Sequence, residues 1–192
     1  MRPETCQTLQ PFPPWTKTDL TLVAILVLAG LSIRLIGLNE GLWIDEIETL
    51  LRFVRLDVGD IIGDYSSRNN HILYSLLAHY SVEWFGESAW ALRLPAALLG
   101  VATIPATYVL GRQLATRNEA FLAGALLATN YHHVWFSQNA RGYTGLLLGA
   151  VLLSIVFIRL LTTERPGYRY VFAYAIIAAL STWIQLTATL VI

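Results

Sequence analysis

Two adjacent carboxylates, Asp45 and Glu46, stand directly after the first long apolar segment of the chain. A positioned carboxylate can take a proton from a hydroxyl group or bind a divalent cation. Ionisable groups at a membrane boundary are costly to desolvate, so their presence there marks a candidate functional site. The alternative is that both acids, together with Glu48, only favour the N-terminal turn of a surface helix. Glu48 itself is expected to pair with Arg52, four residues further on.

The composition is that of an integral membrane protein. Of the 192 residues, 55% are hydrophobic and only 14% are charged, whereas soluble domains carry about 25% charged residues. The single cysteine, Cys6, excludes an internal disulfide framework and a cysteine-based zinc site. No basic tract is present, so nucleic acid is not an expected partner. The expected surroundings are a lipid bilayer, in particular the plasma membrane.

Five apolar segments predict an all-α fold, a multi-spanning transmembrane helical bundle. A helix needs about 20 apolar residues to cross a bilayer. Arg34 lies near the end of the first segment and is expected to snorkel toward the interface. The third segment is short and is expected to break near Asn130. The last one reaches Ile192 without a polar flank, so we expect the chain to be truncated at its C-terminus. The expected spans are 20–38, 89–111, 120–136, 144–161 and 170–192, within one membrane module over residues 19–192.

Residues 39–88, between the first two spans, form a loop that is too long to be structureless. Apolar residues recur at helical spacing over residues 44–54 and again over 71–85, where the apolar stripe ends in Tyr80 and Trp84. Both segments are too short or too polar to span a membrane. They are therefore expected to be amphipathic surface helices that lie in the interface.

The basic residues of the short connections predict the orientation. They place the tail 1–18 in the cytoplasm, and the loop 39–88 and the turn around Arg141 on the extracytoplasmic side. Arg141 and Arg93 then lie outside, against the trend that keeps basic residues inside. This makes both arginines candidates to bind an anionic group. The alternative is interfacial anchoring, for Arg141 beside Tyr143.

Four motifs in this order resemble the GT-C glycosyltransferases, specifically the branch of protein mannosyltransferases and aminoarabinose transferases. The motifs are Asp45-Glu46, then Asn69-Asn70-His71-Ile72-Leu73-Tyr74, then residues 91–100, and then residues 136–143. The resemblance covers roughly residues 31–161. Each motif is weak alone, but four in order on this hydropathy pattern are fairly specific. The chain departs from the family pattern after His71, where Ile72 and Leu73 replace the prolines of many relatives.

The resemblance implies an enzyme that takes a hexose or pentose from a polyprenyl-phosphate carrier. The acceptor would be a glycan, lipid or protein on the extracytoplasmic side. Asp45 is the implied general base or acceptor-orienting carboxylate, with Glu46 supporting it or binding a divalent metal ion. His71 is expected to contact the carrier phosphate or that metal ion. The remaining expected substrate contacts are Arg93, Arg141 and Tyr143. A missing C-terminal part or a partner subunit would supply further contacts.

Two other interpretations stay open. The first is a non-catalytic or truncated membrane subunit that keeps the fold, in which case Asp45→Asn would leave cellular glycosylation unchanged. The second is a transporter module. A transporter would place ionisable groups at mid-membrane on broken spans, whereas the acids of this chain cluster in the loop 39–88.

Overall fold

The computed structural model describes residues 14–67, 69–163 and 165–190, and every regular element in these ranges is helical. The predicted all-α fold is therefore confirmed. Most of the predicted tail, residues 1–13, lies outside the described residues. The helices are α1 (Lys17–Leu35), α2 (Ile44–Thr49), α3 (Val58–Gly63), α4 (Ile72–Phe85), α5 (Ala89–Leu114), α6 (Arg117–Thr129), α7 (Tyr131–Ser137), α8 (Tyr143–Thr162) and α9 (Tyr168–Ile184). A π-helical turn, η1 (Leu50–Val54), follows α2, and a 3-10 turn, η2 (Leu186–Leu190), follows α9.

Three of these helices, α1, α5 and α8, are long and apolar enough to cross a membrane, which makes the chain an integral membrane protein. The other two expected spans form shorter helices. The third one is divided at Asn130 into α6 and α7, as its sequence indicates. The fifth gives the 17-residue α9, which ends at Ile184 because Gln185 adopts an extended backbone with φ of −156°.

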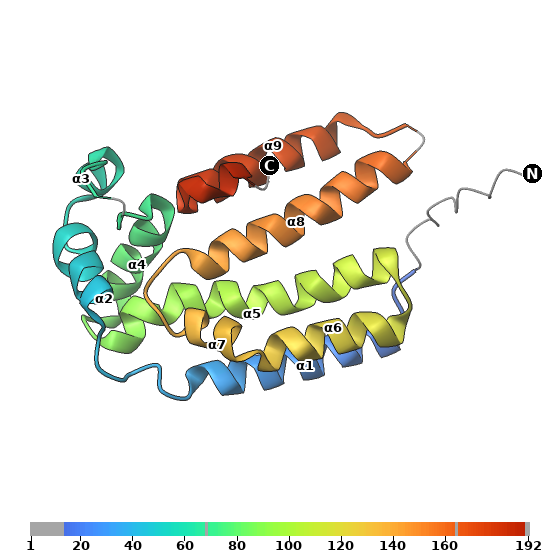
Figure 1. Cartoon of the computed structure of the whole chain (residues 1–192), viewed down its shortest axis with the longest axis horizontal. Helices are drawn as coiled ribbons and strands as arrows, with labels where there is room; N and C mark the ends of the chain where they lie inside the picture. The colour runs from blue at the N-terminus through green and yellow to red at the C-terminus, as the bar shows by residue number, and fades with distance from the viewer. Residues whose placement is uncertain (1–13, 68, 164, 191–192) are drawn as a thin grey trace, which may run out of the picture.

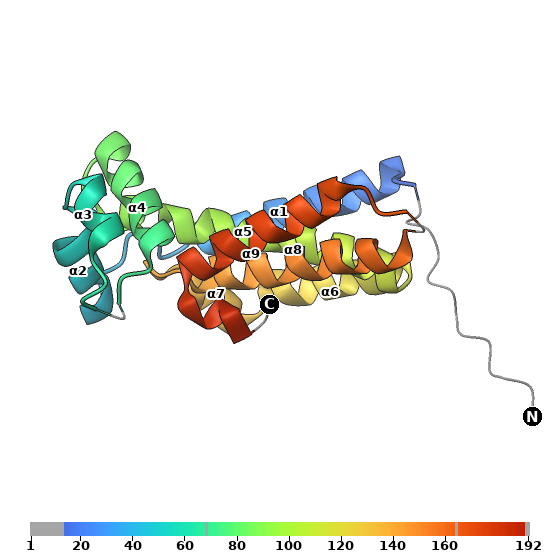
Figure 2. The ribbon, with the colours of Figure 1, turned by 90° about the horizontal axis from the view of Figure 1, so that it is seen from above.

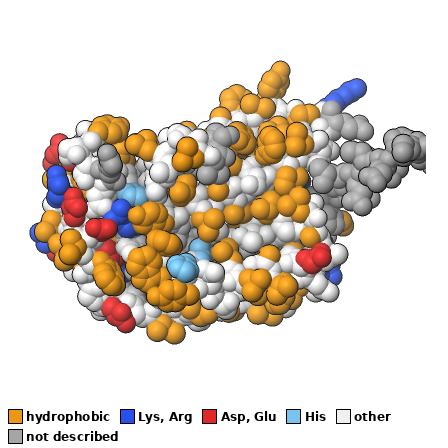
Figure 3. Space-filling model, in the orientation of Figure 1, with side chains coloured by type: hydrophobic (Ala, Val, Ile, Leu, Met, Phe, Trp, Pro, Cys, Tyr) orange, Lys and Arg blue, Asp and Glu red, His pale blue; other side chains and the backbone are white. Residues whose placement is uncertain are grey.

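The long helices run side by side along the molecule, and α2, α3 and α4 gather at one end (Figures 1 and 2). We call this end, residues 44–85, the cap. Helix α5 occupies the centre and packs against α1, α4, α6, α7 and α8. Hydrophobic side chains cover much of the face between the ends, where a membrane protein meets lipid (Figure 3).

Helix α4 turns its small and polar residues inward and its apolar stripe outward. Ser75, Ala78 and Ser81 are buried, whereas Tyr80 and Trp84 are exposed. Small residues let neighbouring helices approach closely, and an exposed apolar stripe suits a membrane interface. The Ser81 hydroxyl donates a 2.6 Å hydrogen bond to the carbonyl of Ala91. The cap is thereby fixed to the start of α5.

At the opposite end, a buried carboxylate joins the helices α1, α5 and α6. Asp19 in the first turn of α1 accepts hydrogen bonds from the Tyr108 hydroxyl at 2.6 Å and from Arg112 Nε at 3.1 Å, both in α5. Arg117 Nε, at the start of α6, donates to the same oxygen at 3.1 Å. Removing one partner of a buried ion pair leaves an uncompensated charge. Asp19 therefore fixes the relative positions of α1, α5 and α6.

The expectation that Arg34 snorkels to the interface is wrong, because its side chain is fully buried. Its Nη1 donates to the carbonyls of Gly30 at 2.9 Å and Ala128 at 3.1 Å, and its Nε donates to Ser137 Oγ at 3.0 Å. Its Nη2 lies 2.6 Å from His133 Nδ1. Ala128 belongs to the last turn of α6, whose negative end favours a cation. Arg34 thus connects α1 to the end of α6 and to α7.

Candidate active site

An ion pair between Asp45 and Arg141 lies where the cap meets the long helices. Asp45 is in the first turn of α2, and Arg141 is in the turn between α7 and α8. Asp45 Oδ2 lies 3.0 Å from Arg141 Nη1, and the two side chains are 68% and 10% exposed, respectively. The carboxylate is therefore accessible to a molecule from solvent, while the guanidinium is largely buried behind it.

The Arg141 guanidinium is only partly satisfied. Its Nη2 donates to the Tyr143 hydroxyl at 3.3 Å, and the guanidinium carbon lies 5.4 Å from the centre of that ring. Its Nε is buried and makes no hydrogen bond within the described part of the chain. Its Nη1, also buried, has the Asp45 carboxylate at 3.0 Å as its partner. A buried donor without an acceptor costs about 1–3 kcal/mol. The guanidinium therefore keeps Nε as a donor with which to bind an anion, and Nη1 becomes a second donor when an anion replaces Asp45.

His71, at the start of α4, places a further donor beside Arg141. Burial and the positive charge of Arg141 lower the pKa of His71 to about 4, so the ring is neutral at pH 7. Its Nδ1 accepts a hydrogen bond from the Gly142 N–H at 3.3 Å, so the single ring proton belongs on Nε2. Nε2 lies 3.4 Å from Arg141 Nη2, itself a donor. An anionic oxygen is the acceptor that would satisfy both groups.

Gly142 allows this close approach. A Cβ at this position would lie 2.6 Å from His71 Nδ1 and 2.9 Å from Ile184 Cγ2. Such distances are too short for real Cβ contacts, so any side chain would push the start of α4 and the end of α9 apart. Glycine is therefore needed where the turn before α8 passes between these two elements.

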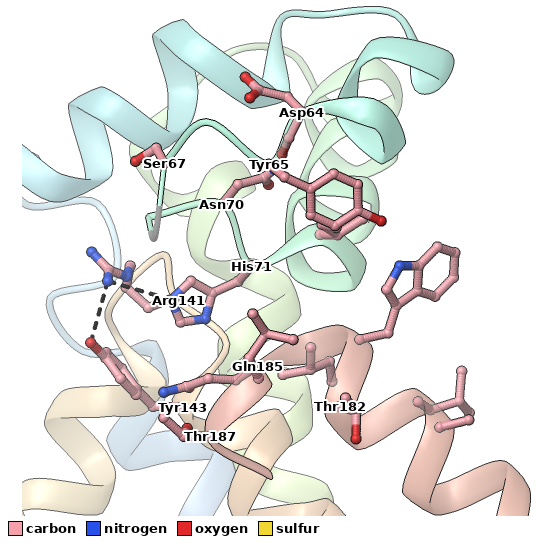
Figure 4. A pocket seen from close by; sticks show the side chains of 16 residues that line it. Asp64, Tyr65, Ser67, Asn70, His71, Arg141, Tyr143, Thr182, Gln185 and Thr187 are labelled. Carbon is pink, nitrogen blue, oxygen red and sulfur yellow. Dashed lines mark hydrogen bonds between the residues drawn. The ribbon is translucent and has the colours of Figure 1, made fainter. Parts of the chain in front are cut away.

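A cavity of about 860 Å³ opens beside Arg141, between the start of α4 and the end of α9. Figure 4 shows Arg141, His71 and Tyr143 along one side of it, with Asp64, Ser67 and Asn70 of the cap above and Gln185 of α9 below. The α9 side also contributes the apolar residues Leu180, Ile184 and Leu186. The cavity thus joins a cationic, polar side to an apolar side.

Behind the first ion pair lies a second one, which is completely buried. Arg93 Nε and Nη2 donate to the Glu46 carboxylate at 2.8 and 2.6 Å, and the two side chains are 3% and 0% exposed. The same carboxylate accepts the N–H of Trp43 at 2.9 Å and the N–H of Ala140 at 2.7 Å. Each carboxylate oxygen therefore already has two donors.

These contacts engage every polar side-chain atom of Glu46 and Arg93. With both oxygens engaged, Glu46 has none to offer to a substrate or a metal ion, and the Arg93 guanidinium is likewise occupied. Glu46 follows Asp45 directly in the chain. Its Oε1 accepts a hydrogen bond from the N–H of Ala140, the residue before Arg141. The buried pair therefore fixes the two backbone segments that carry Asp45 and Arg141. In this geometry Glu46 and Arg93 are positioning residues.

The hypothesis that Glu46 and His71 hold a metal ion does not fit these contacts. Glu46 is saturated by donors, and His71 faces the positive charge of Arg141. Across the described ranges, no group of three or more His, Cys, Asp or Glu side chains is placed to hold a metal ion. In this arrangement it is Arg141 that provides positive charge at the site.

The contacts made by two parts of the site were not predicted from the sequence. Asn69 belongs to one of the four motifs, but the sequence assigned it no role. Its Nδ2 donates to the Asp45 carbonyl at 3.1 Å and to Glu48 Oε2 at 3.2 Å. The side of the cavity formed by the end of α9 was not predicted either, because no sequence spacing relates Gln185 to Arg141. The Glu48–Arg52 pair, by contrast, forms as predicted, at 3.0 Å.

Comparison with known proteins links the chain to a protein family. A family model described as dolichyl-phosphate-mannose-protein mannosyltransferase matches residues 70–192, more than half of the chain. The matched range includes His71, Arg93 and Arg141 and begins after Asp45. No curated protein and no solved structure matches the chain.

Proposed function

Because the chain belongs to the dolichyl-phosphate-mannose-protein mannosyltransferase family of GT-C membrane glycosyltransferases, we propose that it transfers a sugar from a polyprenyl-phosphate carrier. The acceptor is a hydroxyl group on the extracytoplasmic side of the cell membrane. The N-terminus is cytoplasmic in this proposal, and the cap faces outward.

The incompletely satisfied guanidinium of Arg141 is the observation that carries the proposal. The buried Nε of the guanidinium has no acceptor within the described residues, and Nη1 is paired only with the exposed carboxylate of Asp45. The Nε2 donor of His71 lies 3.4 Å from the third nitrogen, Nη2. Phosphate oxygens match such a convergent set of donors. The apolar α9 wall of the same cavity suits a lipid chain. Together they favour a phosphate group that is attached to a lipid.

The chemistry assigned to the site is a single substitution at the anomeric carbon. The acceptor oxygen forms a bond to that carbon while its proton passes to Asp45. The bond between the anomeric carbon and the phosphate oxygen breaks, and the electron pair leaves with the phosphate. Arg141 stabilises the negative charge that develops on this leaving group. The proton on Asp45 is then released to solvent, to which the carboxyl group is exposed.

The assay uses membranes that contain the full-length protein and a panel of radiolabelled polyprenyl-phosphate sugars, including mannose, glucose and aminoarabinose. Wild type should transfer at least one of these sugars to an endogenous acceptor. Asp45→Asn should lower the rate by about 10²–10⁴-fold, as expected for loss of a general base. The matched control is Asp60→Asn, which alters an exposed acid in α3 and should leave the rate unchanged. Full activity of Asp45→Asn would contradict the proposed mechanism.

A further inference from the structure

Gln185 carries a buried acceptor that nothing in the described structure satisfies. The residue ends α9 with an extended backbone, and its side chain lines the cavity beside Arg141. Figure 4 shows this side chain reaching from the end of α9 toward Tyr143, below His71. Its Oε1 is buried and has no hydrogen-bond donor. Leaving such an acceptor unpaired is unfavourable unless a ligand supplies the donor.

The position of Gln185 is fixed relative to the anion-binding groups. The preceding residue, Ile184, is buried and packs on Gly142: a Cβ on that glycine would lie 3.1 Å from the Ile184 carbonyl oxygen. Gly142 lies directly between Arg141 and Tyr143 in the chain. The end of α9 therefore moves with the turn that carries Arg141, and the amide keeps its place in the cavity.

We infer that Gln185 is a specificity-determining residue that accepts a hydrogen bond from a hydroxyl group of the donor sugar. This inference rests on the proposed function, because it places the carrier phosphate at Arg141. The sugar is bonded directly to that phosphate, so its ring must lie in the adjoining part of the same cavity. An amide oxygen can only accept, and a sugar ring offers hydroxyl donors on most of its carbons.

A hydroxyl group of the acceptor substrate would present the same chemistry as one of the donor sugar. The position of Gln185 favours the donor sugar, because the amide shares its cavity with Arg141 and His71, whereas Asp45 is open to solvent. Kinetics separate the two sources. A donor contact changes kcat/KM for the donor lipid, and an acceptor contact changes only the KM of the acceptor.

The test compares Gln185→Leu with Gln113→Leu in the full-length protein. Gln113 in α5 is a matched control because its amide is also buried and without a partner, yet it does not line the cavity. The probes are the preferred polyprenyl-phosphate sugar and its monodeoxy analogues. Wild type should reject one analogue about 5- to 100-fold, the range for one unsatisfied buried acceptor. Gln185→Leu should abolish that discrimination and spare the KM of the acceptor, and Gln113→Leu should retain it.

Displacement of a fluorescent donor lipid provides a second measurement that needs no turnover. If wild type transfers no sugar but binds donor lipids with a preference that Gln185→Leu removes, the catalytic proposal fails and the inference about Gln185 stands. The inference is overturned if Gln185→Leu weakens the parent sugar and every deoxy analogue equally. It is also overturned if Gln113→Leu has the same effect, or if only the KM of the acceptor changes.

Discussion

The buried Glu46–Arg93 pair gives the sharpest prediction, that Glu46→Gln destabilises the fold. The glutamine has the same shape but offers one oxygen and one NH₂ group. One oxygen of Glu46 accepts from Arg93 Nε and the Ala140 N–H, and the other accepts from Arg93 Nη2 and the Trp43 N–H. In either orientation of the amide, the NH₂ group therefore meets two donors. Breaking a buried ion pair in this way costs about 3–5 kcal/mol.

The assay is denaturant unfolding of the detergent-solubilised chain, for Glu46→Gln, Arg93→Gln and the double variant. Each single substitution should lower the free energy of unfolding by about 3–5 kcal/mol. The double variant should lose less than the sum, with a coupling of about 1–3 kcal/mol. Glu48→Gln is the matched control, since the same change in the same helix breaks the exposed Glu48–Arg52 pair. That pair should contribute about 0–1 kcal/mol.

Two results would refute this reasoning about Glu46. If Glu46→Gln unfolded at the same free energy as Glu48→Gln, the buried contacts would not support the fold. If Glu46→Gln kept full stability but lost sugar transfer, Glu46 would take part in the reaction directly, beside Asp45 or through a metal ion. Additive costs in the double variant would show that Glu46 and Arg93 act separately.

Three further predictions follow from the same site. The pKa of His71 falls from 6.5 to about 4 on folding, so the unfolded chain binds more protons between these values. Stability should therefore fall as the pH drops from 6.5 to 4, by about 3 kcal/mol, and His71→Gln should flatten that slope in pH-dependent unfolding. Gly142→Ala should displace His71 and weaken donor-lipid binding. The control is Gly59→Ala, because a Cβ at Gly59 meets nothing within 4 Å and should leave binding unchanged. Equal binding by both variants would contradict the packing argument. Asp45→Asn should change the free energy of unfolding by less than about 1 kcal/mol, because its ion pair with Arg141 is exposed on the Asp45 side, and a larger loss would assign Asp45 a structural role.

The sequence predicts the helices of this protein better than it predicts their inward faces. Hydrophobic runs give α1, α5 and α8 directly, because a spanning helix must be apolar along its length. The polar residues inside the bundle follow a different rule. Arg34 has the position of a snorkelling residue, but three neutral acceptors and the end of α6 satisfy it in the interior. Two of these acceptors, Ser137 Oγ and the Ala128 carbonyl, lie 103 and 94 residues away in sequence, so no local pattern records them.

In the candidate site, too, the sequence indicates which residues matter but not which distant residues they contact. Asp45, His71, Arg141 and Tyr143 were each singled out from the sequence, and the structure brings their side chains together. Adjacent residues on a helix point about 100° apart, so Asp45 and Glu46 could not share one role. Which of the two acids faces inward depends on Arg93, 47 residues away in sequence, and this pairing is decided by folding.

The two ion pairs differ in the free energy needed to break them. The pair that is costly to break positions the backbone, and the pair that breaks easily is available for the proposed reaction. The Asp45–Arg141 pair, whose carboxylate is exposed, contributes about 0–1 kcal/mol, whereas breaking the buried pair behind it costs about 3–5 kcal/mol. A phosphate that binds Arg141 can therefore release Asp45 at little cost, while the backbone of both residues stays in place. In the proposed mechanism, the released carboxylate would then be free to accept the proton of the incoming hydroxyl group. Binding of the donor would thus prepare the base, and the buried pair would keep it within reach of the sugar.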